Sequence, residues 1–444
     1  MYAKAELVKF IWIAALCCIS TVASATPAIQ HWRTNNGAKV LFVEDHDLPM
    51  LDIEVTLQAG SSFDTLDKSG VAGLTHKLLD AGAGGLSEDQ VSRGMADIGA
   101  QFGGGFNQDS ASVSLRTLSK PELRDKALDI MARVLQHPEF PEKILTREKA
   151  RLISALKEAE TMPESIAEKA FQKAVFGTHP YALPVNGEVD TVGKLTVQDM
   201  RDFYRAHYQA DHAVVAIIGD ATRTEAEAIA LQLTAQLPVS PAPAALPRVM
   251  TKIAASELRI PHPASQSHIL IGAPGVARGD PDYFPLFVGN YVLGGGGFES
   301  RLMNEVREKR GLAYSVYSYF MPLKQPGAFQ IGLQTRKDQA DEALKLVRGT
   351  LANFIANGPT RQELQAAKQN IIGGFPLRID SNRKILGYLS VIGFYDLPLS
   401  YLDDFTHNVE KVTVAQVRAA FARHIDPMEM ATVIVGAPEE KAAK

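Results

Sequence analysis

Residues 195–219 read LTVQDMRDFYRAHYQADHAVVAIIG, and residues 412–436 read VTVAQVRAAFARHIDPMEMATVIVG. The two stretches align without a gap and share these identical positions: Thr196/Thr413, Val197/Val414, Arg201/Arg418, His207/His424, Ile217/Ile434 and Gly219/Gly436. Each copy opens with a threonine suited to capping a helix, continues with apolar residues at helical spacing, and ends in an apolar run closed by glycine. The chain is therefore expected to contain two copies of one plan, each closing with a helix and a buried strand.

A proline-rich region separates the two copies. Residues 237–247 read LPVSPAPAALP, and the four prolines in this stretch exclude a regular helix and favour an extended linker. The predicted organisation is an N-terminal domain at residues 26–236, a linker at 237–250 and a C-terminal domain at 251–444.

Strand and helix patterns are mixed in both halves. Strands are expected at residues 39–43, 52–58, 112–115, 268–271 and 328–333, and helices at 121–136, 141–160, 339–357 and 361–371. These elements lack the regular βαβ alternation of a parallel sheet, so the α+β class with two homologous lobes is expected. A cleft between such lobes is a common place for a substrate.

The first 25 residues have the pattern of a signal peptide. Lys4 and Lys9 precede a short apolar run at residues 10–20, and Ala23-Ser24-Ala25 supplies the small residues of a cleavage site. Export to a periplasm is expected, with a retained membrane anchor as the alternative. Both cysteines of the chain lie in this segment, so the mature protein would depend on core packing for its stability. The net charge of −4 does not suit a nucleic-acid-binding protein.

Residues 70–80, GVAGLTHKLLD, follow AGSSFD at residues 59–64. Here the chain resembles the M16 metallopeptidases (the pitrilysin, insulinase and mitochondrial-processing-peptidase family), and the resemblance runs from about residue 35 to 438. It implies two homologous lobes, each a mainly antiparallel sheet packed with helices. The active helix of the family carries His-x-x-Glu-His, in which two histidines bind zinc and the glutamate activates water.

Only one zinc ligand of that motif is kept in this chain. The resemblance places His76 at the first histidine, Leu79 at the catalytic glutamate, Asp80 at the second histidine, and Ala155 at the glutamate that completes the ligand set. Because leucine cannot transfer a proton, hydrolysis at this site is not expected, nor is a bound metal. The open alternative is a residual metal site of His76 and Asp80, assisted by Glu158.

A second family signature is intact. Residues 293–316 read LGGGGFESRLMNEVREKRGLAYSV, and in the family an arginine and a tyrosine seven residues apart, here Arg307 and Tyr314, reach the zinc site. Both side chains can donate hydrogen bonds to a developing oxyanion. The alternative is that Arg307 is a solvated helix charge and Tyr314 a core aromatic.

Residues 98–109, with Phe102, Gly103, Gly104 and Gly105 at their centre, resemble the edge strand on which the family binds extended substrate. Glycines permit a close approach of backbones but weaken a strand, so a flexible loop is an equal alternative.

Taken with the resemblance, these residues predict a subunit that needs a partner. Some M16 enzymes divide the site between a zinc-bearing chain and a second chain that supplies the arginine and tyrosine. This chain has the pattern of the second: no cofactor of its own, zinc and His-x-x-Glu-His in the partner, and peptides or unfolded segments as substrate. The alternatives are a non-catalytic scaffold or peptide-binding homologue, and a self-sufficient metallopeptidase with altered ligands.

Overall fold

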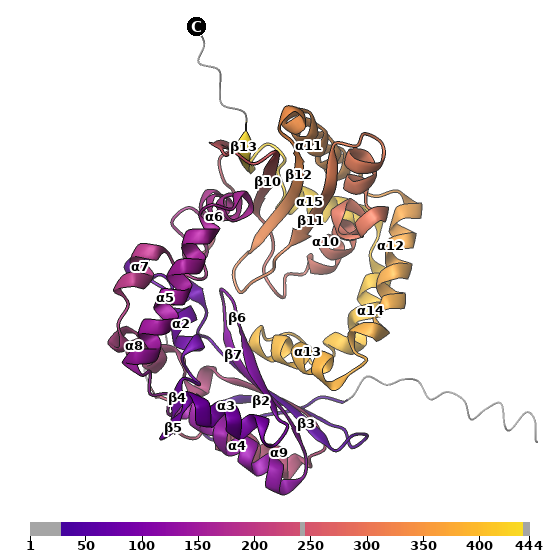
Figure 1. The fold of residues 1–444 in the computed structure, drawn as a ribbon. Coiled ribbons are helices and arrows are strands. Elements are labelled where there is room, and N and C mark those ends of the chain that lie inside the picture. Colours follow the sequence, from indigo (N-terminus) through magenta and orange to yellow (C-terminus); the bar gives the residue numbers. More distant parts are fainter. Residues whose placement is uncertain (1–27, 240–244, 438–444) are drawn as a thin grey trace, which may run out of the picture.

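The computed structural model describes residues 28–239 and 245–437. The predicted signal peptide at residues 1–25 lies outside the described residues, as does the middle of the predicted linker. The chain forms two lobes, each a sheet with helices, and Figure 1 shows the lobes facing each other across the middle of the molecule. No helix among the described residues has both the length and the apolar character needed to cross a bilayer.

Both sheets are mainly antiparallel, and the five strands of the second have the same order as β2, β8, β3, β7 and β6 of the first, to which β1 adds a sixth strand. The first sheet runs β1-β2-β8-β3-β7-β6 and the second β11-β12-β10-β13-β9, with β2–β8 and β9–β13 as the parallel pairs. Their strands are β1 (Gln30–Arg33), β2 (Lys39–Glu44), β3 (Met50–Leu57), β6 (Gln101–Phe106), β7 (Ala111–Leu118), β8 (Val214–Gly219), β9 (Ser256–Pro261), β10 (Gln266–Pro274), β11 (Ala313–Phe320), β12 (Ala328–Arg336) and β13 (Ala431–Ala437). The α+β class with two homologous lobes is confirmed.

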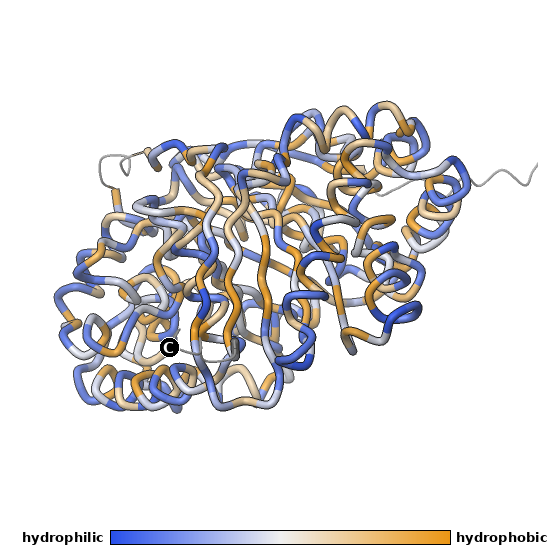
Figure 2. The backbone as a smooth tube through the Cα atoms, turned by 90° about the horizontal axis from the view of Figure 1, so that it is seen from above, coloured by the Kyte–Doolittle hydropathy of each residue, from blue (hydrophilic) through white to orange (hydrophobic). Residues whose placement is uncertain are grey.

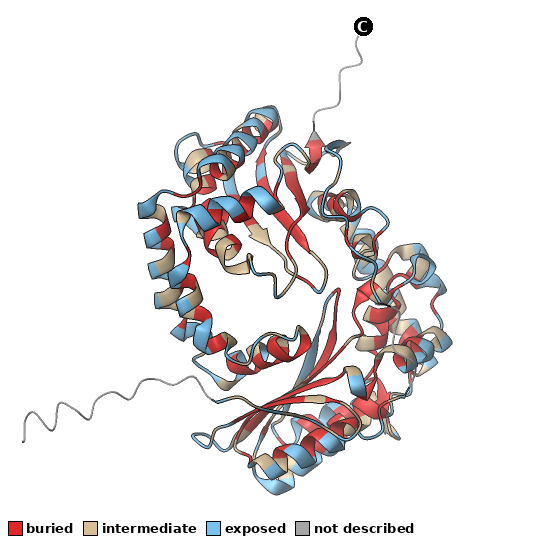
Figure 3. Ribbon diagram, turned by 180° about the vertical axis from the view of Figure 1, so that it is seen from behind, coloured by how far each residue is buried: buried red, intermediate tan, exposed pale blue. Residues whose placement is uncertain are grey.

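The helices cover the sheets and connect the lobes (Figure 2), and the strands between them are largely buried (Figure 3). They are α2 (Val71–Lys77), α3 (Glu88–Ala96), α4 (Pro121–Gln136), α5 (Glu142–Ala159), α6 (Pro163–Phe176), α7 (Val189–Lys194), α8 (Val197–His207), α9 (Arg223–Thr234), α10 (Tyr283–Asn290), α11 (Ala340–Asn357), α12 (Arg361–Gly374), α13 (Asn382–Phe394), α14 (Tyr401–Lys411) and α15 (Val414–His424). A small hairpin, β4 (Gly82–Ala83) with β5 (Leu86–Ser87), lies between α2 and α3.

The two sequence copies form equivalent elements. Thr196 caps α8 and Thr413 caps α15, each accepting a hydrogen bond from the backbone N–H three residues on, at 3.3 and 3.2 Å. Such reciprocal capping stabilises the start of a helix. The strands that follow, β8 and β13, lie in the interior of the two sheets, where every described residue of β8 is buried.

The two halves exchange one helix each. Helix α6, from the N-terminal half, packs on β10 and β13 of the second sheet, and α13, from the C-terminal half, packs on β2, β3 and β8 of the first. The contacts are close: the ring of Phe171 lies 2.6 Å from the place where a Cβ on Gly272 would be, and Val214 lies 2.5 Å from that of Gly393. Each lobe therefore contains residues from both sides of the linker.

A buried carboxylate joins the lobes where the turn of the β6–β7 hairpin meets the turn of the β11–β12 hairpin. Asp109, 1% exposed in the turn between β6 and β7, accepts hydrogen bonds from the hydroxyl of Tyr181 at 2.6 Å and that of Tyr395 at 2.9 Å. It also accepts one from the backbone N–H of Lys324, in the turn between β11 and β12, at 2.7 Å. Because these donors come from both halves, Asp109 fixes the position of one hairpin turn against the other.

Candidate functional site

Helix α2, which carries His76, begins at a buried carboxylate. The side chain of Asp64 accepts hydrogen bonds from the backbone N–H groups of Gly70 at 2.7 Å and Ala72 at 3.0 Å. Burial raises the pKa of Asp64 to about 7, while the two N–H groups act in the opposite direction. This contact explains the position of the acidic residue in the AGSSFD stretch: it satisfies backbone donors at the start of the helix.

The helix ends before it reaches the remaining motif positions. α2 stops at Lys77, and Leu78, Leu79 and Asp80 form a turn that leads into β4 at Gly82. The sequence pattern suggested that His76 and Asp80 stand at i and i+4 of one regular helix. That expectation is wrong, because the helix ends between them. Leu79 is 2% exposed and belongs to the core of the first lobe, whereas Asp80 is exposed.

His76 is packed as an aromatic residue. Its ring stacks on Phe106 of β6, with centroids 5.8 Å apart and planes 14° apart, and its Nδ1 is buried without a hydrogen-bond partner. Burial lowers the pKa of His76 to about 4, and the neighbouring Lys77 adds to this effect. The imidazole is therefore neutral over the physiological pH range.

Helix α5 does not complete a ligand set. Ala155 is exposed on α5, and its methyl group offers no ligand atom. The nearest buried acid on that helix, Glu148, is 8% exposed and accepts from Arg147 at 2.8 Å and Arg151 at 2.9 Å. Zinc in catalytic sites needs three protein ligands and an activating base. The residues at this place supply one imidazole and, beyond the end of the helix, the carboxylate of Asp80, with no base at Leu79 and no ligand at Ala155, so they do not fit a catalytic zinc ion.

Among the described residues, one group of three possible metal ligands lies elsewhere, in the second lobe: Asp280, Asp282 and His424. Arg423 binds both carboxylate oxygens of Asp282, at 2.6 and 2.8 Å, and His424 adds a contact at 3.1 Å. The charge of Asp282 is thus already paired within the protein.

The glycine-rich segment beside His76 is an edge strand. Gln101–Phe106 forms β6, which pairs with β7 on one side and ends the first sheet on the other. Gly103, Gly104 and Gly105 are exposed and Phe102 is half-buried. A Cβ on Gly104 would lie 1.9 Å from the carbonyl oxygen of Ser112 and 3.2 Å from Cε1 of His76, whereas one on Gly103 would meet only the Ser114 hydroxyl at 4.0 Å. The close approach that glycine permits is thus required at Gly104.

Arg307 and Tyr314 lie together on the second lobe. Arg307 is in a π-helical turn at Met303–Glu308, and Tyr314 is the second residue of the edge strand β11, at a register irregularity between Ala313 and Ser315. The Arg307 guanidinium carbon lies 5.2 Å from the Tyr314 ring centroid. Tyr314 is 80% exposed, which excludes the alternative of a core aromatic.

Phe298 completes a stack that the sequence analysis did not identify. The Arg307 guanidinium carbon lies 4.8 Å from the Phe298 ring centroid, so two exposed aromatic rings flank one cation. Phe298 is 65% exposed, and its only signal in the sequence is that it follows the glycine run directly. Cation–π contacts of this kind hold a guanidinium in place while leaving its N–H donors free. The carboxylate nearest to Arg307, that of Glu308, is 3.7 Å away.

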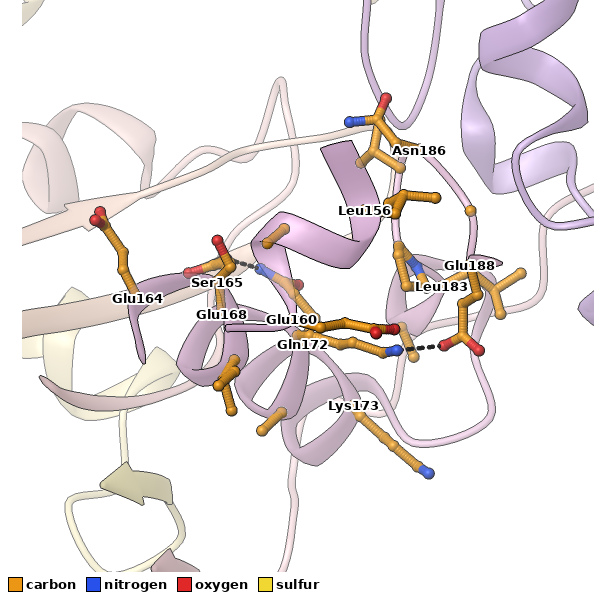
Figure 4. Close-up of a pocket in the computed structure, with 18 of the residues that line it drawn as sticks. Leu156, Glu160, Glu164, Ser165, Glu168, Gln172, Lys173, Leu183, Asn186 and Glu188 are labelled. Atoms are coloured by element: carbon orange, nitrogen blue, oxygen red, sulfur yellow. Dashed lines mark hydrogen bonds and ion pairs between the residues drawn. The ribbon is translucent and has the colours of Figure 1, made fainter. Parts of the chain in front are cut away.

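A cavity of about 750 Å³ lies at the junction of the lobes, between the end of α5, α6 and the loop at residues 182–189 (Figure 4). Ile260 and Met321 of the C-terminal half also line it. Its acidic residues include Glu188, which pairs with Lys169 at 2.9 Å, and Glu168, which accepts from Gln172 at 2.7 Å. The position agrees with the expectation that a cleft lies between two homologous lobes.

Each half of the chain matches a model of a known protein family. Residues 39–188 match the family model described as Insulinase (Peptidase family M16), and residues 194–371 match the model described as Peptidase M16 inactive domain. An uncharacterized zinc protease of Streptomyces coelicolor is 30% identical over 326 residues, which cover 71% of this chain and 70% of that protein. Non-peptidase homolog YmxG of Helicobacter pylori is 26% identical over 417 residues, covering 92% of this chain and 94% of that protein.

Solved structures give the same result. A peptidase M16 inactive domain from Pseudomonas fluorescens superposes with a TM-score of 0.89 at 40% identity, covering 92% of this chain and 98% of that one. A protease from Helicobacter pylori superposes with a TM-score of 0.85 at 18% identity, which supports the fold alone. This chain therefore belongs to the M16 peptidase family, as a homologue of its inactive type.

Proposed function

We propose that this chain is the non-zinc subunit of a heteromeric M16-type metalloendopeptidase, which supplies Arg307 and Tyr314 in trans to a zinc-bearing M16 chain. The observation that carries the proposal is a contrast between the two lobes. Tyr314 is exposed and lies beside the half-buried Arg307, while the positions of the zinc motif hold a packed imidazole, a buried leucine, an exposed aspartate beyond the helix and an exposed alanine. The substrates would be peptides or unfolded segments of proteins.

The chemistry of the pair suits such a role. When a peptide carbonyl is attacked, negative charge develops on its oxygen, and donors aimed at that oxygen stabilise the transition state. Tyr314 offers one phenolic donor on a ring that reaches into solvent, and Arg307 offers several N–H groups, of which one nitrogen lies 3.7 Å from the Glu308 carboxylate. The zinc ion and the activated water would belong to the partner, which carries His-x-x-Glu-His.

The edge strand β6 supports a role in binding substrate. Its outer edge is not paired with another described strand, and extended peptides bind such edges through main-chain hydrogen bonds. In this proposal Phe102 and the three glycines contact the substrate backbone. The pattern of residues 1–25 further supports export, so we place the complex in the periplasm.

The test is reconstitution with a zinc-bearing M16 chain recovered from the same cells. Cleavage of a quenched fluorescent peptide is measured for each chain alone and for the mixture, and activity is expected only in the mixture. Arg307→Ala and Tyr314→Phe should each lower the kcat of the complex by roughly 10²–10³-fold, as loss of an oxyanion donor does in other hydrolases. The matched control, Arg361→Ala, removes an exposed arginine that forms no ion pair with any residue the structure describes.

Two alternative functions give different results in the same assay. Unchanged turnover in both pair variants would favour a scaffold, in line with the name of the Helicobacter pylori relative, Non-peptidase homolog YmxG. Stoichiometric zinc in the isolated chain, lost in His76→Ala, together with cleavage that a chelator stops, would show a self-sufficient peptidase and end the proposal.

A further inference from the structure

A second cavity, of about 560 Å³, lies against the edge strand of the second lobe. Every residue from 315 to 320 of β11 lines it, and α10 and the glycine run form its other walls. β11 ends its sheet, so this side of the strand faces no other described strand. Tyr314 is the residue that directly precedes this lining. The cavity therefore adjoins the Arg307–Tyr314 pair.

The charge of this cavity is entirely positive. Arg278 and Arg378 are the only ionisable cations in its lining, and no aspartate or glutamate lines it. Arg278 donates from Nε to the carbonyl oxygen of Pro322 at 3.1 Å and lies over the ring of Tyr395 at 5.5 Å, which fixes the side chain and leaves its terminal nitrogens free. Among the described residues neither arginine forms an ion pair. Guanidinium groups held in this way suit a carboxylate, which they can bind with two parallel hydrogen bonds.

The wall that α10 forms is aromatic. Tyr283 stacks on Phe287 there, with ring centroids 5.9 Å apart, and β11 adds the apolar side chains of Val316 and Phe320. Aromatic faces contribute apolar contact area and polar edges at the same time, which is typical of sites that bind peptide side chains. The guanidinium carbon of Arg378 lies 6.0 Å from the ring centroid of Phe287, so the charged and aromatic parts of the wall are adjacent.

We propose that this cavity binds a peptide by a carboxylate, which contacts Arg278 and Arg378, and by a neighbouring apolar or aromatic side chain, which packs on the rings of Tyr283 and Phe287. The carboxylate is either the C-terminus of the peptide or an acidic side chain, since both present the same two oxygens. The proposal rests on the proposed function only in taking the bound peptide as substrate. In that case the site would anchor the peptide next to the donors that act on its carbonyl group.

Binding to the isolated full chain tests the proposal without any catalysis. Fluorescence anisotropy is measured with four labelled peptides that share an aromatic residue: a free C-terminal acid, its C-terminal amide, an amidated peptide with internal glutamate, and the same peptide with glutamine. At least one carboxylate peptide is expected to bind about 10-fold or more tightly than its neutral match, the effect of a charged hydrogen bond. Preference for the free acid identifies the C-terminus as the source, and preference for glutamate identifies a side chain.

The arginine variants show whether the cavity is responsible. Arg278→Gln/Arg378→Gln should remove the preference, and Arg361→Gln, an exposed arginine outside the cavity, should keep it. Arg378 is exposed, so Arg378→Gln alone should fold normally and weaken the preference in part, even where the double variant fails to fold. Equal binding of acid and neutral peptides, an undiminished preference in Arg378→Gln, or no binding of any peptide would overturn the inference. Because no partner chain is present, these results are independent of activity in the complex.

Discussion

The hydroxyl of Tyr395 donates a hydrogen bond to the carboxylate of Asp109 over 2.9 Å, although the two residues are 286 positions apart in the chain. Tyr395 follows α13, the helix that crosses to the first sheet, and Asp109 lies in the turn that meets the β11–β12 hairpin. The contact therefore holds the end of α13 against the place where the β6–β7 turn meets the β11–β12 turn.

Removing this contact should destabilise the whole protein. Tyr395→Phe deletes one donor to a buried charge and should lower the free energy of unfolding by about 1–2 kcal/mol. Asp109→Ala leaves the donors from Tyr181, Tyr395 and Lys324 without their acceptor and should cost about 3 kcal/mol or more. Urea unfolding measures both changes. Tyr314→Phe, which alters an exposed hydroxyl, should stay within about 0.5 kcal/mol of the parent protein. Equal stability of all three variants would contradict the contact.

Two of the three glycines of β6, Gly103 and Gly104, should respond differently to a methyl group. Gly104→Ala would force a Cβ against the carbonyl oxygen of Ser112 and the ring of His76, and should lower stability by about 1–3 kcal/mol. The methyl group of Gly103→Ala would enter open space, so this substitution should leave the stability almost unchanged. Thermal unfolding followed by circular dichroism compares the pair. A larger loss in Gly103→Ala than in Gly104→Ala would refute the register of this strand.

The exchange of helices predicts that the halves stay together when the chain is cut. A protease site inserted at residues 240–244 should give two fragments that elute as one species in size-exclusion chromatography and separate only in denaturant. The reason is that α6 and α13 each bury their contacts in the lobe of the other half. Phe171→Ala, which removes a fully buried ring of α6, should cost about 3–5 kcal/mol and weaken the association. Fragments that separate in native buffer would rule out the exchange.

Acid should weaken the fold through His207. Burial lowers the pKa of this histidine from 6.5 to about 4, and a hydrogen bond with the backbone of Gln58 opposes the shift only in part. Between these values the unfolded chain binds the proton and the folded chain does not. The contribution of His207 is therefore complete above pH 6.5 and is lost as the pH falls towards 4, by on the order of 1–3 kcal/mol.

The measurement is the slope of unfolding free energy against pH. Asp64 acts in the opposite sense, because its pKa is raised to about 7 and its folded form holds a proton that the unfolded form releases. The slope is therefore compared between variants. His207→Phe should reduce the loss of unfolding free energy between pH 6.5 and 4, whereas His407→Gln, at an exposed position, should leave it unchanged. Identical slopes in His207→Phe and the parent protein would contradict the burial of this ring.

Phe298 should matter for activity and not for stability. Its ring holds one face of the Arg307 guanidinium and is 65% exposed. Phe298→Ala should lower the kcat of the complex by a few-fold, in line with about 0.5–1 kcal/mol for an exposed cation–π contact, while Phe298→Tyr should retain it. Steady-state kinetics with the zinc-bearing partner measures the effect, and full activity in Phe298→Ala would show that the stack does not position Arg307.

Local sequence patterns determined much of this fold. The expected helix at residues 121–136 appears as α4 with the same bounds, and the expected strand at 328–333 lies within β12. The caps at Thr196 and Thr413 formed as expected, because a cap depends on a donor only three residues away. The spacing of Arg307 and Tyr314 likewise brought the two side chains together, since a helical turn and the start of a strand connect them directly.

The sequence by itself thus determined the two-fold plan, the class of the lobes and the loss of the zinc ligands. Only the tertiary structure decided that α2 ends at Lys77, that α6 and α13 exchange lobes, and that Asp109 joins the hairpin turns. The physical reason is the range of the forces involved. Periodicity and capping act within a few residues. Partners from distant parts of the chain, by contrast, bury Leu79, pack against Phe171 and donate hydrogen bonds to Asp109.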